Sequence, residues 1–89
     1  MNSDTLIDEL KKAHELASQF AGGYSERFMS AEAFSDALGQ AIINLEAGDT
    51  TVLLQLDLWF LPTSDWDNFI KVEGIELGQR ISDMLRSHA

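Results

Sequence analysis

The chain has 89 residues, the size of one domain, with 45% hydrophobic residues and a formal net charge of −9. It has no cysteine, which excludes disulfides and thiolate zinc sites and fits a reducing compartment. The strong negative charge argues against binding to nucleic acids and to anionic membrane surfaces.

The first two predicted elements are amphipathic helices. Apolar residues at helical spacing predict a helix over residues 4–21, and the glycine pair at 22–23 ends it. A second pattern predicts a helix over 31–47, which begins after Ser30 and stops at Gly48. We expect Met29 to pack on Phe34 at its start. Residues 1–4 lack the basic and apolar regions of a signal peptide, so we expect none.

The third element, residues 49–61, is ambiguous. Apolar residues alternate from Val52 to Phe60 as in a strand, yet the rest of the chain offers no second strand to pair with. Its leucine-rich composition favours a buried helix, and the alternative is an edge strand completed by a second copy of the chain. The apolar run, about half the ~20 residues of a membrane span, is interrupted by Gln55 and Asp57. We therefore expect a cytoplasmic protein.

Pro62 ends the third element, and Asp65, Trp66 and Asp67 begin another helical turn. A final amphipathic helix is predicted over residues 72–88, with Gly74 at a bend or start. The predicted fold over residues 1–89 is all-α, a single small antiparallel four-helix bundle.

Acidic residues dominate the middle of the chain, and no basic residue occurs in the 43 positions between Arg27 and Lys71. One interpretation is a solvated surface that keeps the protein soluble. The other is a recognition surface for a basic protein, because a patch of one sign speeds the encounter with an oppositely charged partner. Residues 30–69 carry seven acids, namely Glu32, Asp36, Glu46, Asp49, Asp57, Asp65 and Asp67.

A calcium site is not indicated. Asp65, Asp67 and Glu76 match positions 1, 3 and 12 of an EF-hand loop, but Phe69 and Ile70 occupy positions that need an oxygen ligand and a glycine. The two aspartates are more simply first-turn acids that suit a helix dipole. We expect no metal.

Catalysis is not indicated either. The two histidines, His14 and His88, belong to no ligand-spaced cluster. A helical domain of 89 residues also has little volume for a cleft in which paired carboxylates could act as acid and base. We expect no cofactor and no enzymatic activity.

Both tryptophans and two of the five phenylalanines lie between residues 59 and 69. In so small a protein we expect these rings to close the core where two helices meet, and a ligand-stacking site is the alternative. Trp66 is the exception, because its position between Asp65 and Asp67 predicts partial exposure and a role as an interface anchor. Alternatively, the indole folds back over the core.

Length, acidity and two segments, SAEAFSDALGQAI at 30–42 and EGIELGQRISDML at 73–85, resemble the small acidic immunity proteins of bacteria, especially those against colicin D-type nuclease toxins. This resemblance implies a four-helix bundle without catalysis or cofactor, whose acidic side chains occupy a basic nuclease cleft. We find no counterpart in this family to Gly74, Gly78 or the segment at 58–69.

We therefore expect a non-enzymatic binding protein that covers the basic site of a partner. The residues expected to contact this partner are Glu32, Asp36, Asp65, Trp66 and Asp67. The alternative is a homodimeric structural or regulatory helical module, suggested by the apolar segment Val52–Leu61.

Overall fold

The computed structural model describes residues 3–23, 28–61 and 64–88, and helices are the only regular elements in this part of the chain. The expected all-α class is confirmed. The strand alternative for residues 49–61 is wrong, because most of this segment is helical, and the predicted break at Pro62 lies outside the described residues. In chain order the elements are α1 (Ser3–Ala17), α2 (Ala31–Glu46), α3 (Val52–Phe60), α4 (Asp65–Ile70), the 3₁₀ helix η1 (Lys71–Gly74) and α5 (Ile75–His88).

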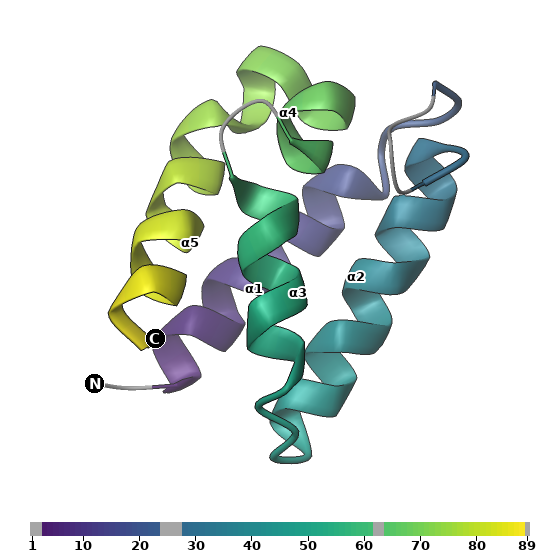
Figure 1. The fold of residues 1–89 in the computed structure, drawn as a ribbon. Coiled ribbons are helices and arrows are strands. Elements are labelled where there is room, and N and C mark those ends of the chain that lie inside the picture. Colours follow the sequence, from purple (N-terminus) through teal and green to yellow (C-terminus); the bar gives the residue numbers. More distant parts are fainter. Residues whose placement is uncertain (1–2, 24–27, 62–63, 89) are drawn as a thin grey trace.

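The four longer helices surround one core. Helix α1 packs against α2 and α5, and α3 packs against the same two helices on the other side. Figure 1 shows α4 at the upper end of the molecule, where α1 ends and α2 begins, and the turn between α2 and α3 at the lower end. The short helix α4 also contacts α1, α3 and α5, so it closes the upper end of the core.

Helix α1 is shorter than the sequence predicts, ending at Ala17 instead of near residue 21. Its last turn tightens, since the Phe20 N–H donates to the Ala17 carbonyl at 3.1 Å, a hydrogen bond between residues three apart. Two left-handed residues follow, Gly22 with φ of 76° and Gly23 with φ of 68°. Glycine adopts such angles without steric cost, so the pair turns the chain back toward α2.

A side-chain cap fixes the start of α2, and an aspartate stabilises the turn before α3. The Ser30 hydroxyl accepts a hydrogen bond from the Ala33 N–H at 3.1 Å, as predicted for an N-cap. Before α3, Asp49 accepts a hydrogen bond from the Thr51 N–H at 3.0 Å and another from its hydroxyl. Both contacts satisfy polar groups at the ends of helices, which would otherwise depend on water.

Phe34 lies at the centre of an aromatic core. Its ring contacts Phe28 at a centroid distance of 5.2 Å, Trp59 at 6.0 Å and Phe69 at 5.5 Å. The expected contact between Met29 and Phe34 is wrong, because the Met29 side chain is exposed and Phe28 packs there instead. The expectation that the rings of residues 59–69 close the core is confirmed.

Candidate functional site

Trp66 and Asp65, expected at the partner interface, are buried. The Trp66 side chain is 1% exposed and that of Asp65 is 0% exposed, so the expected partial exposure of the indole is wrong. The alternative interpretation, an indole folded over the core, describes the structure. In this conformation neither side chain can touch a partner.

The burial of Trp66 has a physical cause that the sequence does not show. Gly74 and Gly78 lie under the indole, and a Cβ atom at either position would be less than 3 Å from its ring atoms. The indole Nε1 donates a hydrogen bond to the Gly74 carbonyl oxygen at 2.8 Å, and the Phe60 ring lies 4.9 Å away. The two glycines thus give the ring room to approach the backbone, and the hydrogen bond satisfies its polar atom.

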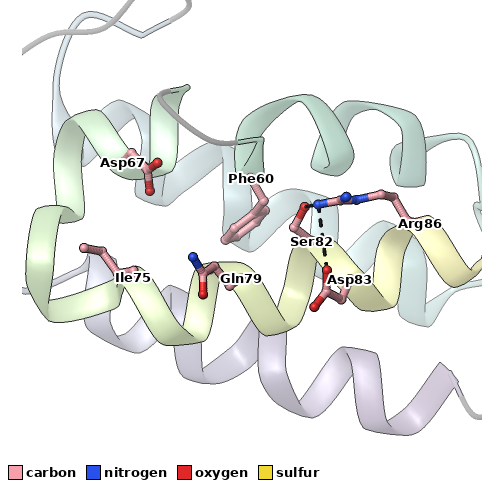
Figure 2. Close-up of a pocket in the computed structure, with 8 residues that line it drawn as sticks. Phe60, Asp67, Ile75, Gln79, Ser82, Asp83 and Arg86 are labelled. Carbon is pink, nitrogen blue, oxygen red and sulfur yellow. Dashed lines mark hydrogen bonds and ion pairs between the residues drawn. The ribbon is translucent and has the colours of Figure 1, made fainter.

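Asp67 is half-buried and lies at one end of a groove of about 240 Å³ between α4, α3 and α5. Figure 2 shows Asp67 at one end and Arg86 at the other, with Phe60 pointing toward Gln79 between them. Arg86 donates to the Ser82 hydroxyl at 2.8 Å and lies 3.8 Å from Asp83. The groove therefore has an apolar wall, an acidic end and an arginine already paired within the protein.

Glu32 and Asp36 lie on the outer side of α2, one turn apart and exposed. Together with Ser18, Phe20 and Ser35 they line a shallow hollow of about 190 Å³, which we call the Phe20 hollow. It forms where the end of α1 lies beside the start of α2 (Figure 1). The sequence predicts the two acids, but not the aromatic side chain and the serines that join them.

Glu32 is also part of the local structure. Its Oε1 accepts a hydrogen bond from the Gly22 N–H at 2.8 Å, and the Gly22 carbonyl accepts one from the Ala31 N–H at 2.9 Å. These bonds attach the glycine turn to the first turn of α2. The hydrogen bond from Gly22 also holds the pKa of the Glu32 carboxyl below its ordinary value, because the bond favours the charged form.

Much of the acidic segment is neutralised or withdrawn from the surface. Glu46 forms an ion pair with Lys11 of α1 at 3.0 Å, so a base remote in sequence balances it. Asp57 is half-buried and Asp65 is fully buried, whereas Asp49 is exposed and accepts hydrogen bonds from Thr51 just before α3. Neither Glu32 nor Asp36 has an ion pair with a base in the described part of the chain. On α2, Glu32 and Asp36 therefore remain as an exposed pair of acids without a neutralising base.

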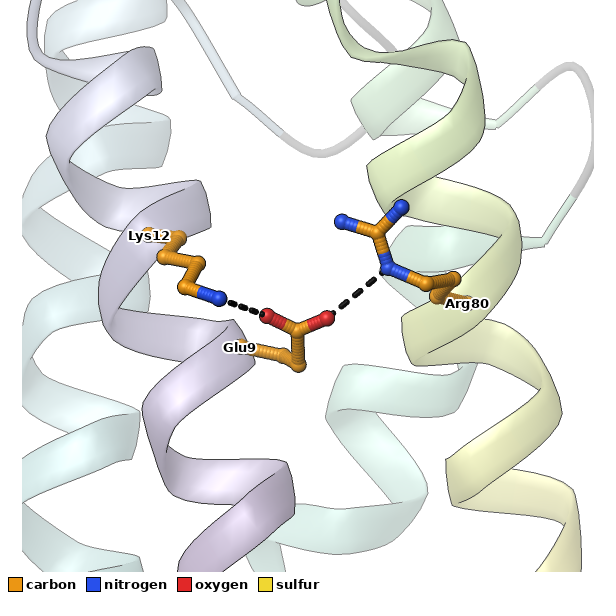
Figure 3. A network of polar contacts seen from close by, with 3 residues as sticks. All are labelled: Glu9, Lys12 and Arg80. Carbon is orange, nitrogen blue, oxygen red and sulfur yellow. Dashed lines mark hydrogen bonds and ion pairs between the residues drawn. The ribbon is translucent and has the colours of Figure 1, made fainter.

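Glu9 is a buried acid outside the predicted site. Figure 3 shows its carboxylate between Lys12 of α1 and Arg80 of α5, at 2.9 Å from the Lys12 Nζ and 2.8 Å from the Arg80 Nε. Hydrogen bonds from Lys12 and from Arg80 lower the pKa of the Glu9 carboxyl. Because both of its oxygens are engaged within the fold, Glu9 is a structural link between α1 and α5.

No group of three or more histidine, cysteine, aspartate and glutamate side chains among the described residues could hold a metal ion. The side chain of His88 lies outside them. Within the same residues, no helix has the length and apolar character to cross a membrane.

Comparisons with protein-family models, curated proteins and solved structures found no match to this chain. The resemblance to immunity proteins therefore stays a prediction. The function has to be argued from the geometry and charge of the surfaces described above.

Proposed function

We propose that this chain is a non-enzymatic acidic protein-binding domain that covers the basic site of a partner, as a bacterial immunity protein covers a nuclease toxin. In this proposal the protein is cytoplasmic and needs neither cofactor nor metal. In the same proposal, the helices α1, α2, α3 and α5 form the antiparallel four-helix bundle expected from the sequence.

The observation that carries the proposal is the pair of exposed acids on α2. Glu32 and Asp36 stand on one side of the helix, without a base of the described residues to neutralise them. Their field adds to that of a chain with a net charge of −9. Such a surface attracts a basic protein over a distance and repels nucleic acid.

The proposed contact residues differ in part from those expected from the sequence. Glu32 and Asp36 remain the centre of the surface, and Asp67 stays a candidate because it lines the groove between α3, α4 and α5. Asp65 and Trp66 instead position α4 from within the core.

The proposal is tested with a pull-down from the native host, using the tagged chain as bait. We expect a basic nuclease to co-purify, to lose its activity when this chain is added, and to bind more weakly as salt is raised. Capture of neutral or acidic proteins only, or binding of a basic protein that is indifferent to salt, contradicts the proposal.

A second candidate function, the homodimeric module, is favoured by the outer face of α3. Leu54 is 73% exposed and Leu58, one turn later, is 40% exposed. Their exposed neighbours Thr51 and Gln55 carry no charge. Two copies of so acidic a chain repel each other, so an uncharged apolar face is where a second copy can approach.

Sedimentation separates the two candidates. A dimer at micromolar concentration that becomes a monomer in the Leu54→Lys variant supports the homodimeric module. A wild-type monomer at the same concentration removes it. The matched control is Ile43→Lys, which changes an exposed apolar residue of α2 instead of α3.

A further inference from the structure

The Phe20 hollow combines an apolar surface with acceptors for hydrogen bonds. Phe20 is half-buried against the core and supplies an aromatic side chain, while Glu32 and Asp36 supply carboxylates. Its volume of about 190 Å³ is below the ~300–1,000 Å³ of sites that enclose small-molecule ligands. The hollow therefore suits one side chain of a partner better than a metabolite.

Ser35 adds a hydroxyl without a described protein partner to the lining of the hollow. The residue is only 6% exposed, and its exposed part contributes to the lining. Its hydroxyl forms no hydrogen bond with another described residue. The hydroxyl oxygen is not among the fully buried oxygens without a partner, so it reaches the hollow, where a ligand can replace water as its hydrogen-bond partner.

The electrostatics of the hollow select a cation. Ser18 follows the last residue of α1, and the carboxyl end of a helix carries partial negative charge. The positive end of α2 is already capped by Ser30. An anion would face the carboxylates of Glu32 and Asp36 at close range, so anionic ligands are disfavoured.

The type of cation follows from the remaining lining. Two carboxylates, one of them bonded to a backbone N–H, are far fewer free oxygen ligands than the six to eight of calcium. An aromatic side chain next to carboxylates matches a guanidinium group, which stacks on rings and donates several hydrogen bonds in a plane. An ammonium group presents the same charge without the planar donors.

We propose that the Phe20 hollow accepts one arginine side chain of a basic protein. The guanidinium lies against Phe20, donates hydrogen bonds to Asp36 and to the Ser35 hydroxyl, and is attracted by the charge of Glu32. This inference rests on the proposed function, because it names the contact through which the acidic face of α2 holds its partner.

The test uses short peptides in place of the unidentified partner. Acetyl-Gly-Arg-Gly-amide is titrated into the ¹⁵N-labelled protein, next to the citrulline peptide, which has the same shape without charge, and the lysine peptide. We expect amide signals of residues 18–20 and 32–36 to shift with the arginine peptide. Affinity for the lysine peptide should be at least about threefold lower, and citrulline should not bind.

Variants of the lining locate the site. Asp36→Asn and Phe20→Leu are each expected to reduce affinity for the arginine peptide by about threefold or more, since each removes one proposed contact. The matched control is Asp8→Asn, which removes the same charge from an exposed position of α1 outside the hollow. Thermal melts of all variants show whether the fold is retained, and Ser35→Ala provides a further change inside the hollow if Phe20→Leu unfolds.

Two results overturn the inference. One is a set of shifts spread over exposed acids, with Asp8→Asn and Asp36→Asn weakening binding equally, which indicates unspecific attraction of charge. The other is the absence of any shift at residues 18–20 and 32–36. Either result leaves the proposed function standing if a basic nuclease still co-purifies. Conversely, arginine binding in the hollow without such a partner contradicts the proposed function alone.

Discussion

The indole Nε1 of Trp66 donates a hydrogen bond to the carbonyl oxygen of Gly74 at 2.8 Å, in the interior of the protein. This bond joins α4 to the 3₁₀ turn before α5 and holds the indole over the backbone. A Cβ atom at Gly78, one turn further on, would be 2.5 Å from the Trp66 Nε1 and Cδ1. The arrangement at the upper end of the molecule therefore depends on the absence of side chains at two positions.

Replacing Gly78 by alanine is expected to destabilise the protein. The added methyl group collides with the indole, and overpacking of this kind costs about 1–3 kcal/mol, of which the higher helix propensity of alanine offsets about 1 kcal/mol. Urea unfolding measures the difference in the free energy of unfolding between the variant and the wild type.

Gly39→Ala is the matched control for this substitution. The three atoms nearest to its added Cβ all belong to the imidazole of His14, with the Nε2 atom at 2.9 Å, on a side chain that can rotate. The loss of stability should be smaller than for Gly78→Ala. Equal stability of the two variants would mean that the indole does not occupy the space above Gly78 in solution.

The burial of Trp66 predicts how its fluorescence responds to a quencher. In a Trp59→Phe variant, Trp66 is the sole tryptophan, and at 1% exposure it should be protected from acrylamide. Unfolding in urea should remove the protection. Strong quenching of the folded variant, at a level near that of the unfolded chain, would restore the interpretation of Trp66 as an exposed anchor.

The sequence predicts the helices better than it predicts the environment of Trp66, for a physical reason. The second helix shows apolar periodicity, a serine cap and a terminal glycine, all of which act within a few residues, and the structure confirms it as α2. The environment of Trp66 depends on Gly74 and Gly78, and helical periodicity gives no sign that a glycine makes room for a ring. Two flanking aspartates are then a poor guide to exposure, since one of them, Asp65, is itself buried.

The sequence also does not show which charges are balanced in the folded protein. Counting residues along the chain finds a segment without bases, but folding brings Lys11 to Glu46. Glu32 and Asp36 on α2 stay exposed and without an ion pair, and their i, i+4 spacing is visible in the sequence. Ser18 and Phe20, which follow the end of α1, lie beside these acids because the chain turns back toward α2, a turn to which Gly22 and Gly23 contribute.

Because of Glu9, we expect the stability of the protein to change with pH in the acidic range. Its pKa is lower in the folded protein than in the unfolded chain, through hydrogen bonds from Lys12 and Arg80. Its contribution to the stability of the folded protein is therefore fully present above the pKa of Glu9 in the unfolded chain. This contribution is lost as the pH falls through the pKa of Glu9 in the folded protein. The Glu9→Gln variant should be less stable by about 1–2 kcal/mol at neutral pH, since both donors stay partly solvated.

Unfolding measured between neutral pH and pH 3 tests this assignment. The difference in the free energy of unfolding between the wild type and Glu9→Gln should become smaller toward acidic pH. Asp83→Asn is the control on α5, because Asp83 is exposed and its contact with Arg86 is long, at 3.8 Å. This variant should stay within about 0.5 kcal/mol of the wild type throughout. If this difference between the wild type and Glu9→Gln does not change with pH, the loss of stability comes from packing instead of charge.

The position of Asp36 in the Phe20 hollow predicts distinct effects on the two rates of partner binding. Asp36→Lys and Asp8→Lys alter the net charge equally, so both should slow association with the captured basic protein at low salt. Only Asp36→Lys should also speed dissociation, by about tenfold or more, because it places a like charge at the proposed arginine contact. Surface plasmon resonance at two salt concentrations separates the two effects. Equal dissociation rates for the two variants would mean that α2 attracts the partner but does not hold it.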